Sequence, residues 1–224
     1  MSDAPRAPAI PRPLFAYALL YGGMTCIAGV LGFKQVALGP LAVEAGIFAF
    51  LMLVVISSTV AQLYGAAMAN SMVRWGFVPL ALSIALIFVV LSLPPPATMP
   101  PENVTAFETV LSQTWRIMAA GPVAYFVSLW LNVRIFSALR GSGADGGGGW
   151  WMMARGAIAS ALSQVVDTLI FITLAFYGEF PIGSLLLGQA LAKVVLSIVL
   201  VPPLIAFLIW LAGRIGQPDT ARGA

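Results

Sequence analysis

Apolar side chains along this chain fall into long runs that are separated by prolines, glycines and charged residues. A helix needs about 20 apolar residues to cross a bilayer, and several runs reach that length. We predict six spanning helices, over about 14–32, 41–64, 76–93, 116–139, 157–177 and 182–211. The runs are continuous, whereas the strands of a membrane barrel alternate between apolar and polar positions. The predicted fold is therefore an all-α membrane protein, a six-transmembrane-helix bundle.

The segments between the predicted spans are short or rich in proline and glycine. Three prolines at 94–96 end the third span, because proline lacks the amide donor that a helix needs. Residues 106–115 predict a short amphipathic helix on the membrane surface, and the glycine-rich residues 141–149 predict a flexible linker. The sixth span contains Pro202–Pro203, where we expect tilting or a bend. The predicted divisions are an N-terminal tail over 1–13, a six-helix membrane domain over 14–212 and a C-terminal tail over 213–224.

Composition supports lipid as the solvent of this chain and excludes several classes of function. Hydrophobic residues make up 60% of the chain and charged residues only 8%, whereas a soluble domain carries about 25% charged residues. With one cysteine and no histidine, the chain has no disulfide framework and no histidine-ligated metal site. We expect no cofactor. The cations flank apolar runs and form no basic patch, so nucleic acid is not an expected partner.

The cations also predict the orientation in the membrane. If the N-terminus is cytoplasmic, nearly all arginines fall on the cytoplasmic side, as the positive-inside rule requires. They are Arg6, Arg12, Arg74, Arg134, Arg140, Arg155, Arg214 and Arg222, with Lys34 as the main exception on the other side. We therefore predict that both termini are cytoplasmic and that the protein is a multi-pass protein of the cell inner (cytoplasmic) membrane.

Two stripes of polar side chains interrupt the last two predicted spans at helical spacing. They consist of Ser160, Ser163, Gln164 and Asp167 in the fifth span, and Gln189, Lys193 and Ser197 in the sixth. Asp167 lies about ten residues into its span, which is roughly 15 Å deep, and Lys193 has a similar depth. A charge at that depth costs about 2.5–3.5 kcal/mol. Since the two spans are antiparallel neighbours, the stripes can face each other.

Two interpretations of these charges stay open. Asp167 and Lys193 can form an ion pair that only holds two helices together, although membrane helices are usually joined by small or neutral polar residues. Alternatively, they line a polar pocket to which other spans contribute. The further candidate binding residues are Ser58, Gln62, Asn132 and Arg116. Glu44 lies about three residues inside its span, so we expect it to be a solvated acid at the membrane interface.

Such a pocket suits a flat heterocycle with several N–H donors, because a carboxylate accepts two parallel N–H bonds. The chain further resembles a known family in the sequence WWMMARGAIASALSQVVDTLIF, with Lys193 and Pro203 after it. This stretch is similar to the pattern W-x-R, a serine or threonine, then S-Q-x-x-D-[ST]-x-I-F of the queuosine-precursor transporter family, also called the vitamin uptake transporter family. RIMAAGPVAY (116–125) and QLYG (62–65) are similar to two further patterns of that family.

The resemblance implies uptake of 7-cyano-7-deazaguanine, 7-aminomethyl-7-deazaguanine or both, with Asp167 binding the guanine edge. Ser58, Gln62 and Asn132 stand where the family commonly carries acids. Fewer acids would weaken selection for the cationic aminomethyl compound, so the resemblance favours the neutral cyano compound. The expected partners are this small-molecule substrate and the lipid bilayer, with a homodimer left open.

The leading interpretation is a secondary transporter, and three other functions are alternatives to it. One is a substrate-binding subunit of an energy-coupling-factor type importer, which would dock onto a separate ATPase. Another is a structural subunit in which Asp167 and Lys193 act only as a helix contact. An intramembrane enzyme is disfavoured, because the sequence offers no histidine, no evident pair of nucleophile and base, and no metal cluster. The sequence also has no phosphate-binding loop for ATP. Transport could be driven by protons through Asp167 or by metabolic trapping of the imported base.

Overall fold

The structure is a computed structural model that describes residues 10–138, 149–179 and 181–216. Inside the helices, the side chains at 129, 132–133, 136–138, 149–157, 159–161 and 216 lie outside that description. Residues 141–148 of the predicted linker and most of both predicted tails also lie outside the described residues, and Gly149 is the first residue of a helix.

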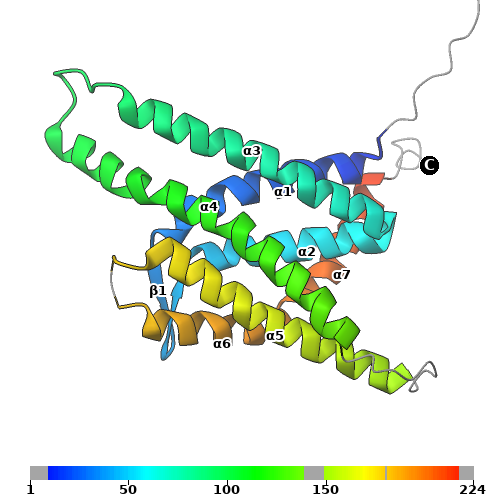
Figure 1. The fold of residues 1–224 in the computed structure, drawn as a ribbon. Coiled ribbons are helices and arrows are strands. Elements are labelled where there is room, and N and C mark those ends of the chain that lie inside the picture. Colours follow the sequence, from blue (N-terminus) through cyan, green and yellow to red (C-terminus); the bar gives the residue numbers. More distant parts are fainter. Residues whose placement is uncertain (1–9, 139–148, 180, 217–224) are drawn as a thin grey trace, which may run out of the picture.

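Helices make up nearly all of the described chain (Figure 1). In chain order the elements are α1 (Arg12–Gly32), β1 (Gln35–Leu38), β2 (Leu41–Glu44), α2 (Gly46–Tyr64), α3 (Ala66–Ser92), α4 (Pro101–Ala138), α5 (Gly149–Phe176), α6 (Gly183–Val199) and α7 (Val201–Gly216). The helical membrane-protein class predicted from the sequence is confirmed, with one small hairpin added.

Three of the described helices, α1, α2 and α3, are long and apolar enough to cross a membrane. The pair α6 and α7, bent by 47°, would be a fourth span if it is counted as one. The bend comes directly before Pro202–Pro203, where the sequence predicted it, because proline is tolerated in the first turn of a new helix and breaks the old one. The start of α1 and the end of α7 lie at the same end of the bundle (Figure 1). Six spans and cytoplasmic termini remain predictions.

The start of the second predicted span was wrong. Leu41–Glu44 is a strand that pairs antiparallel with Gln35–Leu38, with Val36 opposite Val43. Gly39, with φ of +59°, and Pro40 make the turn between them, and a positive φ is one that glycine adopts without strain. The valines favour a pleated conformation, so α2 begins only at Gly46.

Two other boundaries also differ from the prediction. The third helix begins ten residues earlier than expected, at Ala66, and continues past Pro79. Residues 106–115 do not form a separate surface helix, because α4 runs without interruption from Pro101 to Ala138. No glycine or proline lies between 102 and 120 to end a helix there.

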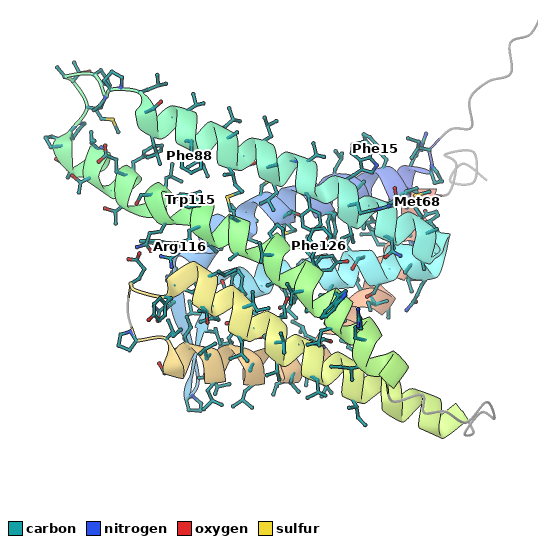
Figure 2. All side chains as sticks on the ribbon, in the orientation of Figure 1. Phe15, Met68, Phe88, Trp115, Arg116 and Phe126 are labelled. Carbon is teal, nitrogen blue, oxygen red and sulfur yellow. The ribbon has the colours of Figure 1, made fainter. Side chains whose placement is uncertain are left out.

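Two large hydrophobic clusters hold the helices together, and a smaller one joins the hairpin to α2 and α6. The first joins α1, α2, α3 and α7, with Tyr17, Val55 and Leu208 in its interior. The second joins α4, α5 and α6 around Ile172 and Leu185. Large apolar side chains also project outward from the bundle, with Phe15 and Met68 among those labelled in Figure 2. An exposed apolar surface of this extent is expected of a protein whose outer solvent is lipid.

Candidate functional site

A cavity lies between the two large hydrophobic clusters. Its volume of about 410 Å³ is within the usual range for small-molecule sites. The hairpin and all helices from α1 to α6 contribute to its wall. Most lining side chains are apolar. The charged lining residues are Glu44, Asp167 and Lys193, and the polar ones are Tyr21, Thr25, Ser57, Ser58, Asn70 and Tyr125.

Asp167 of α5 and Lys193 of α6 form an ion pair in the wall of this cavity. Lys193 Nζ lies 2.8 Å from Asp167 Oδ2, and the two side chains are 7% and 16% exposed, respectively. Ser128 of α4 donates a hydrogen bond of 3.2 Å to Asp167 Oδ1. The Lys193 ammonium also lies 4.6 Å from the ring centroid of Phe50, close enough for a cation–π contact. The two facing stripes therefore meet through these two charges.

Glu44, at the end of β2, is not the solvated interfacial acid that we expected. It is 3% exposed and lines the cavity. Gln189 Nε2 donates to Glu44 Oε1 at 2.7 Å, and the Glu44 backbone amide donates to Gln189 Oε1 at 3.1 Å. Glu44 Oε2 has no hydrogen-bond partner among the described residues.

The hairpin that carries Glu44 lies outside the spanning helices, and its surroundings shift the acidity of this side chain. Burial raises the pKa of Glu44 to about 7, although the nearby charge of Lys193 lowers it in part. The Gly46 amide and the Gln189 side chain also favour the charged form, without completing a hydrogen bond to Oε2. Glu44 therefore changes its charge near neutral pH.

Glycines make room for this arrangement. A Cβ on Gly188 of α6 would collide with the backbone of Ala42 in β2. A Cβ on Gly46 would lie 2.5 Å from Glu44 Oε2, and one on Gly32 would lie 3.1 Å from the same oxygen. These contacts are too close for a larger residue without a shift of the neighbours. The missing side chains therefore let the hairpin approach α6 and bring Glu44 to Gln189.

The predicted site residues divide into two groups. Asp167, Lys193 and Ser58 line the cavity. Gln189 is not part of the cavity wall, but it donates a hydrogen bond to Glu44, which is. The side chains of Gln62 and Gln164 are exposed and that of Ser163 is buried, and none of the three is part of the cavity wall. Ser160 and Asn132 lie on α5 and α4, with side chains outside the described part of the chain.

Arg116 binds the end of α5 and does not reach the cavity. Its Nε donates to the carbonyl of Leu174 and its Nη2 to the carbonyl of Tyr177, both at 2.7 Å. It also forms an ion pair of 3.4 Å with Glu179. Figure 2 shows Arg116 on α4 beside the start of the α5–α6 connection. Helix C-termini leave carbonyls without partners, and Arg116 satisfies two of the carbonyls near this end.

The sequence reasoning missed Glu44, Asn70 and Phe50 as cavity residues. The signal for Glu44 was its position two residues before Gly46, where a chain turn could leave an acid inside the bundle. The match to known families adds to this geometry: a family model described as "Putative vitamin uptake transporter" matches residues 44–207.

The chain belongs to the vitamin uptake transporter family. The matched region begins at Glu44 and includes Ser128, Asp167, Gln189 and Lys193, so it contains all the charged residues of the cavity. The resemblance seen in the sequence is thereby confirmed. Membership in this family indicates a membrane transporter for a small molecule. Comparisons with curated proteins and with solved structures gave no match.

Proposed function

We propose that this member of the vitamin uptake transporter family imports 7-deazaguanine precursors of queuosine and binds them in the cavity between the two large hydrophobic clusters. The observation that carries the proposal is the pair of Asp167 and Lys193 in the wall of a vacant volume of about 410 Å³. A buried ion pair that served only as a helix contact would not need open space beside it. This pair has apolar walls around it and room for a fused ring.

The side chains around the pair match the groups of a guanine-like edge. The ring N–H and the exocyclic amine of such an edge are parallel donors, and a carboxylate has about four lone-pair positions to receive them. Ser128 and Lys193 occupy only part of that capacity on Asp167. Lys193 has three N–H donors, so it can serve both Asp167 and a ring carbonyl. Phe50, Phe171 and Tyr125 provide aromatic faces for a flat ring.

The bend between α6 and α7 supports a transport cycle without an ATPase. Secondary transporters bind their solutes near the middle of the membrane, often beside interrupted helices, and expose the site to each side in turn. Here α6 carries Lys193 and ends one residue before the bend. Proteoliposomes that contain only this chain should therefore take up labelled 7-deazaguanines. Uptake that requires an added ATPase subunit would contradict this arrangement.

A thermal-shift experiment on the detergent-purified protein tests the binding step. A ligand at 100 times its dissociation constant stabilises the folded state by about 2.7 kcal/mol. The two 7-deazaguanines should raise the melting temperature, whereas adenine, which lacks the guanine edge, should not. Asp167→Asn should remove the shift, and Gln62→Ala, an exposed position outside the cavity wall, should keep it. Equal shifts for the wild type and Asp167→Asn would refute the proposal.

A further inference from the structure

The cavity has three charged lining residues, and two of them neutralise each other. Lys193 and Asp167 pair at 2.8 Å. Within the described part of the chain, Glu44 has no ion-pair partner at all. When Glu44 is ionised, the lining carries one negative charge in excess.

Glu44 is also fixed in position with one acceptor free. Gln189 binds Oε1, and the Glu44 backbone amide binds Gln189 in return. Oε2 is buried without a hydrogen-bond partner, while the residue as a whole lines the cavity. A buried acceptor without a donor costs roughly 1–3 kcal/mol, and a charged one costs more. A donor on a ligand would remove this cost, and a positively charged donor would remove the excess charge as well.

The two carboxylates are held by neighbouring positions of α6. Gln189 and Lys193 are four residues apart on α6, so they lie on one face of the helix and about 5–6 Å from each other at Cβ. Gln189 holds Glu44, and Lys193 holds Asp167. In a 7-substituted 7-deazaguanine, the N–H edge and the 7-substituent lie on opposite rings of the fused system. A ligand that presents its edge to Asp167 therefore has its other ring available to Glu44.

We infer that Glu44 is a ligand-binding carboxylate that makes the cavity favour a ligand with a protonated amine, here the aminomethyl over the cyano compound. This inference rests on the proposed function. It reverses the expectation drawn from Ser58, Gln62 and Asn132, because that expectation counted the acids absent from three positions and did not include the acid at 44. Its position near the start of the predicted span suggested a solvated acid at the membrane interface, but Glu44 is buried and lines the cavity.

The test compares the two 7-deazaguanines, which share the ring system and differ only in the 7-substituent. Binding is measured for the wild type, Glu44→Gln and the control Glu179→Gln, which makes the same chemical change at an exposed site. Glu44→Gln should weaken binding of the aminomethyl compound about tenfold or more and that of the cyano compound less than about threefold. Glu179→Gln should change neither. Equal weakening of both ligands, or no change in either, would overturn the inference.

A measurement on the unmodified protein covers the case in which Glu44→Gln does not fold. The wild type should bind the aminomethyl compound about tenfold more tightly than the cyano compound. Equal affinities, or a preference for the cyano compound, would overturn the role of Glu44. If neither compound binds the wild type, the proposed function itself fails, so the two failures can be told apart.

Discussion

Gln189 and Lys193 lie one turn apart on the same face of α6, and each holds a carboxylate from another part of the chain. Gln189 binds Glu44 of the hairpin, and Lys193 binds Asp167 of α5. Helix α6 therefore fixes both acids of the cavity, and its polar residues are the structural centre of the site.

The charge balance between Asp167 and Lys193 can be tested through stability alone. Lys193→Met leaves the Asp167 carboxylate without its cation, and loss of one partner of a buried pair costs about 3 kcal/mol of unfolding free energy. We expect the double variant Asp167→Asn/Lys193→Met to be more stable than Lys193→Met, because no unpaired charge remains. Thermal unfolding of the wild type, Asp167→Asn, Lys193→Met and the double variant in one detergent gives the coupling energy between the two side chains. Additive losses would show that the pair is not coupled.

The approach of the hairpin to α6 depends on Gly188. We expect Gly188→Ala to lower the unfolding free energy by about 1–3 kcal/mol, because the new methyl group meets the Ala42 backbone. Ligand binding should weaken as well, since the hairpin carries Glu44. Gly183→Ala, in the first turn of the same helix with nothing within 4 Å of the added carbon, is the matched control and should be neutral or slightly stabilising. Similar melting temperatures for both variants would contradict this account of the hairpin.

The raised pKa of Glu44 predicts a pH dependence of stability. Burial raises this pKa from 4.5 to about 7, so the folded state binds a proton more tightly than the unfolded state. The contribution of Glu44 to stability is therefore full below about pH 4.5 and is lost as the pH rises through about 7. The loss is at most about 1.4 kcal/mol per pH unit.

Melting temperatures across this pH range check the prediction. The other titratable groups of the cavity wall are Asp167 on α5, Lys193 on α6, Tyr21 on α1 and Tyr125 on α4. Glu44→Gln keeps all of them, so the difference between its pH profile and that of the wild type isolates Glu44. We expect the variant to have the flatter profile, and parallel profiles would exclude Glu44 as the source.

Arg116 should affect stability and leave ligand selection unchanged. Arg116→Gln removes the donors to the carbonyls of Leu174 and Tyr177, and we expect a loss of about 1–3 kcal/mol. The affinity ratio of the two 7-deazaguanines should stay within about twofold, because Arg116 is outside the cavity wall. A selective loss of one ligand would instead assign Arg116 to the binding site, as the sequence first indicated.

The sequence predicted the helices better than it predicted the site. Long apolar runs and prolines define helices over tens of residues, and Pro202–Pro203 therefore located the break between α6 and α7. Helical spacing likewise identified Asp167 and Lys193, because each of them shares a helix face with other polar residues. The strand 41–44 was missed because its four residues continue directly into an apolar run. The β preference of Val43 is too weak a signal in so short a segment to separate a strand from a helix start.

The partners of the polar residues depend on distances that the sequence does not contain. Gln189 belonged to the predicted stripe, yet its partner is Glu44, which is 145 residues away. Gln62 and Gln164 are also glutamines on predicted polar faces, but both are exposed and neither is part of the cavity wall. The close approach of the hairpin to α6, which Gly188 and Gly46 allow, brings Glu44 to Gln189. That approach is a property of the packed bundle.

The hollow between the two large hydrophobic clusters has a mechanical consequence. Within either cluster, sliding one helix past another would disrupt interlocked side chains. Across the hollow between the two large clusters, the lining side chains have no such partners to interlock with. A solute that binds both acids would fill this hollow and connect the helices on its two sides. Binding and release of the solute would therefore restrain and then free the movement of these helices relative to each other.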